Sequence, residues 1–529
     1  MGLFNRRWSR RGLLKTLGWA PAAVSPVVLT APAESAPLKL PKLTGHEKDN
    51  LFTRIGVRPI INGRGTFTII SGSRSLPEVK QAMFEASHYY VHLDEMMDGI
   101  GAKLGQLTGA EWGIATNGCE AAIVLATAAC IAGTDVEKSL ALPYTKAKDQ
   151  VIIPNHSRNQ YELGMRMVGA ELVEVTSPDE LRAKISPRTA MIYIMSGPRA
   201  LNGQMAIANI CAIAKEKGIP VFVDAAAEEP LRPNIHLAAG ATLVGYSGGK
   251  CLRGPQSSGM MIGDKNLCRA AYFQAAPHHT YGRALKCSKE EAMGLLAAVE
   301  QWYKRDHDAE QRMWRSWLKT IENRLKPLPS TNFEYLEPND LSNKATQLRI
   351  RWDANVLKIT GSEVAAKLDA GTPRILLASS SGRRPDQMAS SVTVMPYMMD
   401  AGEERIIADA LFAVLSKPGS YSNPPMPSGP MAAVGGTWIV ALTYPRGDAS
   451  HTMTLTQNGD TVTGQHKGVI FTGTMRGTVR AGTVELRSTM PNPGNNFSYT
   501  FHGTVNGNRM SGTVDMGEYG SATWEAVKA

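Results

Sequence analysis

Two short stretches of the chain decide its fold: Ile219-Pro-Val-Phe-Val-Asp224 and Ala241-Thr-Leu-Val-Gly-Tyr-Ser-Gly-Gly-Lys250. Each contains a run of apolar residues, which is typical of a strand that is buried on both faces of a parallel sheet. The first run ends in an aspartate and the second leads into Ser-x-x-Lys, so that Lys250 follows Asp224 by 26 residues. Open α/β sheets bind their ligands beyond the carboxyl ends of the strands, and we predict that both side chains lie there.

The residue types at these strand ends fit pyridoxal 5′-phosphate (PLP). This cofactor needs a lysine that bonds to its aldehyde, a buried carboxylate that keeps its ring nitrogen protonated, and a hydroxyl near its phosphate. We therefore predict that Lys250 is catalytic and binds the cofactor together with Asp224 and Ser247. Taken alone, each residue has a structural alternative, because a lysine after two glycines is often solvated and an aspartate after a strand often caps a helix.

Two earlier segments supply further predicted contacts with the cofactor. Asn117, Gly118 and Cys119 follow a short strand and begin a helix of small residues, whose free amide groups form a site for the phosphate. His156 follows the strand-like Val151–Ile153, and we predict that its ring stacks on the cofactor and transfers protons. The alternative for each is a purely structural role, since such turns and single histidines are common in α/β proteins.

In this order along the chain, the four features resemble fold-type I PLP enzymes. Longer stretches look like the selenocysteine synthase (seryl-tRNA selenium transferase) superfamily and, within it, the branch that contains D-glucosaminate-6-phosphate ammonia-lyase. The resemblance covers about residues 50–415 and is carried by Ile61-Asn-Gly-Arg-Gly-Thr66, His92-Leu-Asp-Glu-Met96, Leu107-Thr-Gly-Ala-Glu111, Val223-Asp-Ala-Ala-Ala227 and Ser247-Gly-Gly-Lys-Cys-Leu-Arg-Gly-Pro-Gln256.

The resemblance implies less about the substrate than about the fold and cofactor. Selenium transferases act on aminoacyl-tRNA in the cytoplasm, whereas this chain has an export-like N-terminus and no clear RNA-binding extension. We expect a PLP-dependent lyase acting on an amino acid or amino sugar acid, with an α,β-elimination that releases ammonia and a 2-oxo acid. The alternatives are selenium transferase-like transfer, aldol cleavage, racemisation, transamination, or a non-catalytic binding protein on the same scaffold.

A substrate carboxylate needs a guanidinium, whose planar fork matches two oxygens. Arg374, at the start of a strand-like run, and Arg64, between two glycines, are the candidates, and a surface ion pair is the alternative for either. Enzymes of this fold usually complete each site with a neighbouring subunit. The resemblance therefore implies a homodimer or a higher homo-oligomer.

Strand and helix patterns divide the chain into domains. Their alternation over residues 55–287 predicts the PLP-binding large domain, with a mostly parallel sheet covered on both faces. Residues 288–415 are predicted to form a small α+β domain that begins with one long helix, Glu290–Arg324. Residues 416–435 are rich in proline, glycine and serine and are typical of a linker.

The last segment, residues 436–529, differs from the rest in its pattern of residues, which indicates strands alone. Short alternating strands are interrupted by Asn458-Gly459 and Asn506-Gly507, which are strong hairpin signals. We predict a small all-β barrel or sandwich. Its Trp438 and Trp524 either plug the interior or line a sugar site.

Residues 1–33 have the features of an export signal. Ser9-Arg-Arg-Gly-Leu-Leu-Lys15 resembles the twin-arginine signal, an apolar stretch follows, and Ala31-Pro-Ala33 offers a small-x-small cleavage site. We expect a twin-arginine signal peptide over residues 1–33, a spacer over 34–54, and a periplasmic or extracellular protein. A basic disordered tail is the alternative.

The composition also limits the classes of molecule that the protein is expected to bind. The net charge is +10, but residues 1–33 carry five basic and no acidic residues, so the rest is only mildly basic. We expect a small-molecule amino substrate, no nucleic acid, and no membrane span once the signal is removed. The six cysteines lie in the α/β part, several in apolar runs, which favours buried thiols over disulfides, and no Cys-x-x-Cys or histidine cluster indicates a metal.

Overall fold

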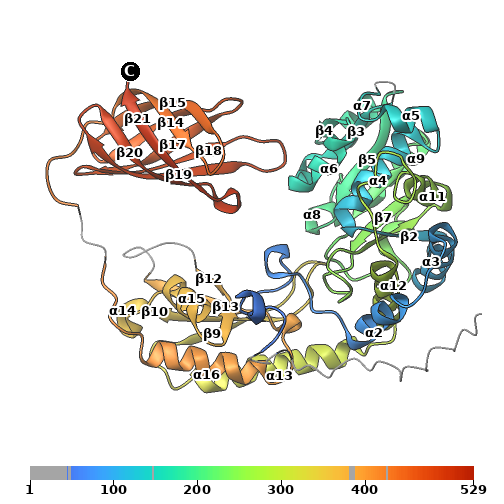
Figure 1. Cartoon of the computed structure of the whole chain (residues 1–529), viewed down its shortest axis with the longest axis horizontal. Helices are drawn as coiled ribbons and strands as arrows, with labels where there is room; N and C mark the ends of the chain where they lie inside the picture. The colour runs from blue at the N-terminus through green and yellow to red at the C-terminus, as the bar shows by residue number, and fades with distance from the viewer. Residues whose placement is uncertain (1–44, 46–48, 146–147, 381–387, 424–426) are drawn as a thin grey trace, which may run out of the picture. The chain divides into compact units, whose positions relative to one another are not determined.

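The computed structural model describes residues 45, 49–145, 148–380, 388–423 and 427–529. The predicted signal peptide and most of the predicted spacer lie outside the described residues. The elements below belong to Leu51–Ala529, which forms one compact unit by its internal contacts, and Figure 1 traces them. Three large hydrophobic cores follow one another along the chain, in the large domain, the small domain and the C-terminal β segment.

A seven-stranded sheet forms the centre of the large domain, in the order β2-β8-β7-β6-β5-β3-β4. Neighbouring strands are parallel except at β8, which runs antiparallel to β2 and β7. The mostly parallel sheet predicted from the sequence is therefore confirmed. The strands are β2 (Trp112–Thr116), β3 (Gln150–Pro154), β4 (Glu171–Val175), β5 (Thr189–Met195), β6 (Val221–Asp224), β7 (Leu243–Ser247) and β8 (Gly259–Gly263).

The sheet is covered on both faces, because every residue of β2, β6 and β8 is buried. Helix α4 contacts β6, β7 and β8, and its alanines allow the close approach that buries every residue from Ala121 to Ala132. The helices of this domain are α2 (Pro77–Ala86), α3 (Leu93–Thr108), α4 (Gly118–Ala132), α5 (Val136–Ala141), α6 (Leu163–Met167), α7 (Pro178–Lys184), α8 (Pro198–Leu201), α9 (Ile207–Glu216), α10 (Ile235–Ala238) and α11 (Lys265–Phe273).

Two helices, α12 (Lys289–Trp302) and α13 (His307–Leu325), stand where one was predicted. The prediction of a single helix over Glu290–Arg324 is wrong because a second helix begins directly after Asp306. The side chain of Asp306 accepts a hydrogen bond from the backbone N–H of Ala309 at 2.9 Å, which caps the first turn of α13.

The small domain is built on a four-stranded antiparallel sheet in the order β12-β13-β10-β9. Along β10, Leu348, Ile350 and Trp352 are buried, whereas Arg349 and Arg351 lie on the more exposed face, as the period of a strand requires. The strands are β9 (Asn332–Leu336), β10 (Gln347–Asp353), β12 (Ala378–Ser379) and β13 (Ala389–Val394), and the helices that follow α13 are α14 (Ala354–Leu357), α15 (Gly361–Ala370) and α16 (Glu403–Ser416).

The segment before α2 connects the two domains. Strand β1 (Ile60–Asn62) pairs in parallel with β11 (Arg374–Leu376), so it joins the small domain although it precedes the large one. A few residues later, the backbone N–H of Ser73 donates to the carbonyl of Gly249 at 2.9 Å. This contact brings residues 68–75 to the loop that carries Lys250.

The C-terminal segment is a closed barrel of eight antiparallel strands, which decides between the predicted barrel and sandwich. Trp438 and Trp524 are buried inside it, so they fill the interior. Their ring nitrogens donate to the carbonyls of Val434 at 2.8 Å and Thr513 at 3.1 Å. The strands are β14 (Gly436–Thr443), β15 (Asp448–Asn458), β16 (Thr461–Lys467), β17 (Thr472–Arg480), β18 (Thr483–Met490), β19 (Phe497–Asn506), β20 (Arg509–Asp515) and β21 (Ser521–Lys528).

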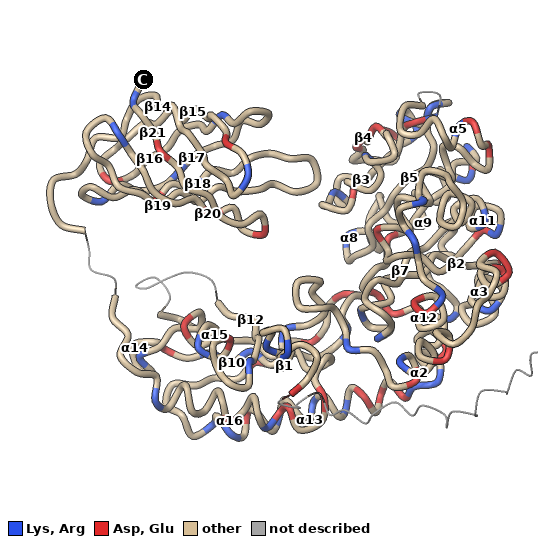
Figure 2. Tube along the Cα trace, in the orientation of Figure 1, with Lys and Arg blue, Asp and Glu red and all other residues tan. Residues whose placement is uncertain are grey.

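All six cysteines are free thiols, four of them buried and two partly buried. Figure 2 shows acidic and basic positions interspersed along α13, without a long run of one sign. Among the described residues, no helix is long and apolar enough to cross a membrane.

Candidate active site

The loop after β7 places Lys250 in a pocket. Its two glycines are required by close packing, since a Cβ on Gly248 would lie 2.1 Å from Ser258 Oγ and a Cβ on Gly249 would lie 2.6 Å from the Cα of Gln256. The side chain of Lys250 lines the pocket beyond them. Within the described residues, its amine has neither a hydrogen bond nor an ion pair, so it is free to react.

Asp224 ends β6 and is 5% exposed. Its Oδ2 accepts a hydrogen bond from Tyr193 at 2.8 Å, and its Oδ1 accepts from the backbone N–H of Ala226 at 3.1 Å and from the thiol of Cys119 at 3.4 Å. Burial and the nearby charge of Asp224 raise the pKa of both the Cys119 thiol and the Tyr193 hydroxyl, which keeps both groups protonated as donors.

No cation pairs with Asp224 among the described residues, although a buried carboxylate without a positive partner is costly. The three donors that hold it are neutral. A positively charged group that enters the pocket would complete its electrostatics, and a protonated pyridine ring is such a group.

The first turn of α4 lies in the same pocket. Gly118 has a φ of 87°, in the left-handed region that favours glycine, and Asn117 directs its amide to the carbonyl of Lys286 at 3.1 Å. A Cβ on Gly259 would lie 2.8 Å from the backbone nitrogen of Cys119, so only glycine lets β8 approach this turn. Free amide groups and the dipole of a 15-residue helix favour an anion here.

The pocket has a volume of about 770 Å³ and brings together six of the predicted residues: Asn117, Gly118, Cys119, Asp224, Ser247 and Lys250. One buried hydroxyl in its wall, Ser73 Oγ, has no hydrogen-bond partner in the part of the chain that the structure describes. An unpartnered hydroxyl and a row of backbone amides fit a phosphate, and the carboxylate and the free amine fit the ring and the aldehyde of PLP.

His156 lies outside this lining. It belongs to the short 3-10 turn after β3, where its Nε2 lies 3.1 Å from the carbonyl of Met205 and its Nδ1 lies 3.0 Å from Ser157 Oγ. Because a carbonyl only accepts, Nε2 carries the proton and Nδ1 accepts from Ser157. Burial lowers the pKa of His156, so the ring stays neutral with both nitrogens engaged.

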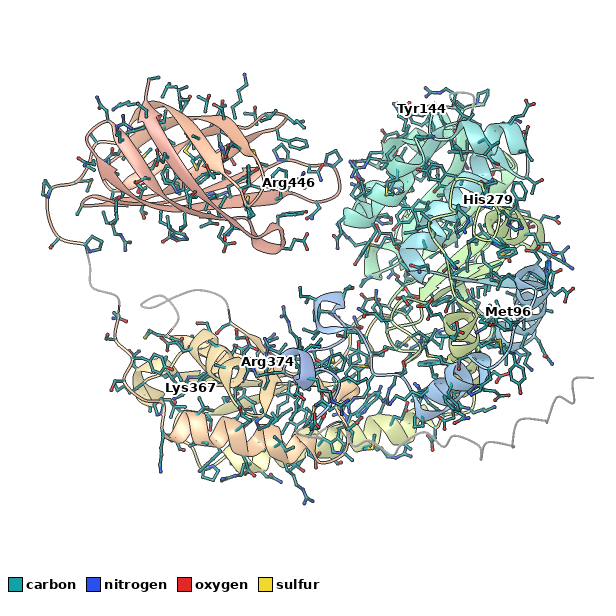
Figure 3. The ribbon with its side chains drawn as sticks, viewed as in Figure 1. Met96, Tyr144, His279, Lys367, Arg374 and Arg446 are labelled. Atoms are coloured by element: carbon teal, nitrogen blue, oxygen red, sulfur yellow. The ribbon has the colours of Figure 1, made fainter. Side chains whose placement is uncertain are left out.

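The two predicted substrate arginines also lie outside the lining. Arg374 pairs with Asp369 at 2.5 Å between Nε and Oδ1, and Figure 3 labels it in the small domain. The hydrogen bond from Arg374 lowers the pKa of the Asp369 carboxyl. Arg64 is exposed, with its guanidinium carbon 4.9 Å from the centre of the Phe67 ring. Among the described residues that line the pocket, there is no arginine.

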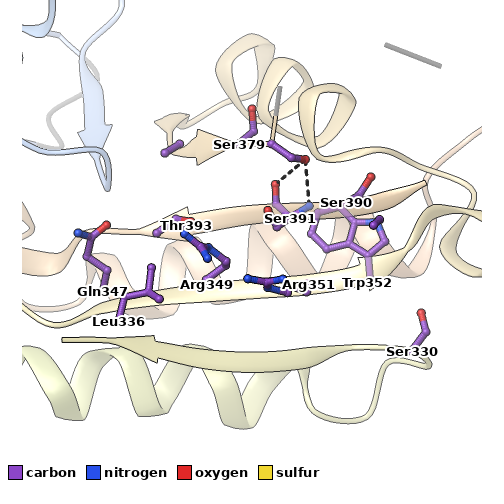
Figure 4. A pocket seen from close by; sticks show the side chains of 13 residues that line it. Ser330, Leu336, Gln347, Arg349, Arg351, Trp352, Ser379, Ser390, Ser391 and Thr393 are labelled. Carbon is purple, nitrogen blue, oxygen red and sulfur yellow. Dashed lines mark hydrogen bonds between the residues drawn. The ribbon is translucent and has the colours of Figure 1, made fainter. Parts of the chain in front are cut away.

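A second pocket, of about 550 Å³, lies on the small-domain sheet (Figure 4). Arg349 and Arg351 lie there beside the hydroxyl groups of β12 and β13. Both cations share one carboxylate, since Glu334 Oε2 lies 3.4 Å from Arg349 Nη1 and 2.8 Å from Arg351 Nη2. None of the predicted cofactor residues lines this pocket.

Sequence reasoning missed several residues of the cofactor pocket. Glu120, in the first turn of α4, lines it, and burial followed by the charge of Asp224 raises the pKa of its carboxyl. Tyr193 is not part of the lining but donates to Asp224 at 2.8 Å. A hydroxyl in a fully buried strand requires a partner, which is the signal that the sequence carries for it. The others come from segments without a pattern of their own: Thr68, Ser73, Ser75, Tyr161, Gln256, Ser257 and Glu291.

Comparison with known proteins supports the cofactor. Residues 74–289 match the family model described as Cys/Met metabolism PLP-dependent enzyme, and this range contains every predicted cofactor residue, from Asn117 to Lys250. A solved structure of D-glucosaminate-6-phosphate ammonia-lyase is similar in fold, with a TM-score of 0.60 at 25% identity, covering 70% of this chain and 99% of that chain.

Curated relatives carry different reaction names. D-glucosaminate-6-phosphate ammonia lyase of Salmonella typhimurium is 28% identical over 333 residues, which cover 61% of this chain and 87% of the relative. 5′-C-glycyluridine monooxygenase-decarboxylase of a Streptomyces species is 28% identical over 342 residues, which cover 62% and 83%. L-seryl-tRNA(Sec) selenium transferase of Carboxydothermus hydrogenoformans is 27% identical over 280 residues, which cover 47% and 57%. The predictions of fold type I, of an enzyme and of PLP as its cofactor are thus confirmed.

Proposed function

We propose that this PLP-dependent enzyme of fold type I catalyses an α,β-elimination on an unphosphorylated amino acid or amino sugar acid, releasing ammonia and a 2-oxo acid. The observation that carries the proposal is the free amine of Lys250, which lines one pocket with the buried carboxylate of Asp224. The similarity to an ammonia lyase supports the reaction class.

Lys250, Asp224 and the first turn of α4 would hold the cofactor. Bound PLP supplies an electron-withdrawing ring that stabilises negative charge at the substrate α-carbon. Asp224 would keep a proton on the ring nitrogen by pairing with its charge, and the amide groups of Gly118 and Cys119, which line the pocket, would bind the phosphate.

Lys250 is the base and then the acid of this scheme. Its Nζ takes the α-proton of the substrate, the bond from the β-carbon to its hydroxyl or similar group breaks, and the same Nζ returns a proton to the departing group. The released enamine is hydrolysed to a 2-oxo acid and ammonia. His156 is a weaker candidate for the acid, because its Nε2 proton is held by the carbonyl of Met205.

A substrate carboxylate would find its ligand in a second copy of the chain. The lining of the pocket lacks an arginine among the described residues, and large apolar side chains are exposed beside Thr68, which lines it. Phe67 is 49% exposed and Ile69 87%. Exposed apolar surface of this kind marks an interface, and it supports the proposed homo-oligomer. Sedimentation of the purified chain tests this, and a monomer at all concentrations would contradict it.

The test of the reaction is a screen of the full chain, loaded with PLP, against amino acids and amino sugar acids. Ammonia and 2-oxo acid should appear together in equal amounts, and Lys250→Ala should release neither. Aldehyde release would indicate aldol cleavage instead, and 2-oxo acid formed only when an amino-group acceptor is added would indicate transamination. A PLP-loaded protein that turns over none of these substrates would contradict the proposal.

Export remains a proposal that rests on residues 1–33 alone. Changing Arg10 and Arg11 together to lysine should retain the protein in the cytoplasm if the twin-arginine route carries it. Fractionation of cells that express the full chain measures this. Export that is indifferent to the two arginines would contradict this route.

A further inference from the structure

The hydrogen bonds of Asp224 leave one acceptor position open. A carboxylate offers about four such positions, two on each oxygen. Among the described residues, Oδ1 accepts from Ala226 at 3.1 Å and from Cys119 at 3.4 Å, whereas Oδ2 accepts only from Tyr193 at 2.8 Å. The remaining position is therefore on Oδ2, the oxygen that Tyr193 holds.

Tyr193 is itself fixed by Asn159. The amide nitrogen of Asn159 donates to the Tyr193 hydroxyl at 3.2 Å and to the carbonyl of Ser157 at 2.7 Å, and its Oδ1 accepts from the backbone N–H of Tyr161 at 2.7 Å. Both Asn159 and Tyr193 are buried. Because the hydroxyl accepts from Asn159, its own proton is directed to Asp224.

We propose that Tyr193, oriented by Asn159, is a positioning residue that fixes the Asp224 carboxylate so that its one open acceptor position, on Oδ2, is available to the ring nitrogen of PLP. The inference concerns the cofactor and does not depend on which reaction follows. Without the Tyr193 hydroxyl, the carboxylate is free to rotate between its remaining donors, and binding of the ring must restore its orientation.

Two measurable consequences follow for Tyr193→Phe. The equilibrium dissociation constant for PLP should rise about tenfold, which corresponds to roughly 1.4 kcal/mol, close to the loss of one hydrogen bond to a charged group. The ring nitrogen should also be less firmly protonated. A less positive ring withdraws fewer electrons from the lysine-linked end of the cofactor, so the pH at which the visible absorption band changes should move upward.

Tyr246→Phe is the matched control. Tyr246 is fully buried in the neighbouring strand β7 and its hydroxyl accepts from the amide of Asn234 at 2.7 Å, but within the described residues no hydrogen bond joins it to Asp224. Each substitution removes the acceptor of one buried asparagine amide, and Tyr193→Phe also removes the donor to Asp224, so Tyr193→Phe should lose somewhat more stability than Tyr246→Phe. Only the Tyr193 variant should change the affinity for PLP and the transition of the band.

The experiment is a titration of the full-length apoenzyme with PLP, followed by a pH titration of the absorption spectrum, for the wild type and the two variants. Equal dissociation constants and equal transition pH values for Tyr193→Phe and Tyr246→Phe would overturn the proposal. If Tyr193→Phe does not fold, Asn159→Ser replaces it and should move both readouts in the same direction by a smaller amount. If Asn159→Ser leaves both unchanged, the proposal is wrong. Neither readout needs a substrate, so failure here is distinct from failure of the proposed elimination.

Discussion

The cofactor pocket and the interior of the barrel both bury polar side chains among apolar ones. The two regions differ in how many of these polar groups have a hydrogen-bond partner. In the barrel, His466 Nε2 lies 2.9 Å from His451 Nδ1 and His466 Nδ1 lies 2.8 Å from Ser488 Oγ, and all three residues are buried. In the pocket, the described residues leave the amine of Lys250 and one position on Asp224 without a partner. A buried polar cluster that satisfies itself supports the fold, whereas one that leaves groups open is prepared for a ligand.

The largest effect should come from removing the open amine. Lys250→Ala should lower turnover by about 10³-fold or more, because the variant lacks both the covalent attachment and the base. Ammonia release under saturating PLP measures it, with circular dichroism as the control for folding. Turnover within tenfold of the wild type would place the reactive amine elsewhere.

Removing the charge of the open carboxylate should have the next largest effect. Asp224→Asn keeps the shape of the side chain but cannot balance a protonated ring, so turnover should fall by about 10²-fold. The dissociation constant for PLP should rise in the same variant. An unchanged affinity would show that the carboxylate serves the fold alone, as the polar groups of the barrel do.

In the barrel, the buried polar residues bond to one another, so pH should change the stability of the barrel whereas a ligand should not. Burial lowers the pKa of His466 to about 3, with the charge of His451 adding to the effect, and burial also lowers the pKa of His451. Unfolding below pH 6.5 therefore takes up protons, so this stability is fully present above pH 6.5 and is lost as the pH falls toward 3. We expect the barrel to lose about 2 kcal/mol between pH 7 and pH 5.

Hydrogen exchange of β15, β16 and β18 in urea, measured on the full chain at both pH values, follows this loss. His466→Gln is the control, since glutamine does not titrate and its share of the pH dependence should disappear. The same pH dependence in both proteins would assign the effect to other groups.

A substitution in the second pocket, on the small-domain sheet, should have the smallest effect on turnover and stability. Arg349 and Arg351 are already paired with Glu334, so Arg349→Ala should leave turnover unchanged and change stability by less than about 1 kcal/mol. Steady-state kinetics and thermal unfolding measure the two. A loss of turnover would show that a pocket with paired charges can also be functional.

Most of the fold could be predicted from the sequence, because the buried strands of the large domain are short apolar runs that end in polar residues, as in Val221–Asp224. The same local logic predicted six residues of the pocket. It failed at Asp306, where one capping side chain starts a new helix although the pattern of apolar residues continues through it. It also could not place Tyr193 or Ser73, because buried hydrogen bonds and pocket walls depend on segments that are distant in sequence. Arg374 instead pairs with Asp369, which lies only five residues earlier at the end of α15.

If the site functions as proposed, the amine of Lys250 attaches PLP covalently in this pocket. The most direct measurement is the visible absorption spectrum of the purified protein before and after treatment with borohydride, compared with that of Lys250→Ala. We expect a yellow band that borohydride abolishes in the wild type and that is absent from the variant. A colourless wild type that added PLP does not change, or an identical reducible band in Lys250→Ala, would contradict it.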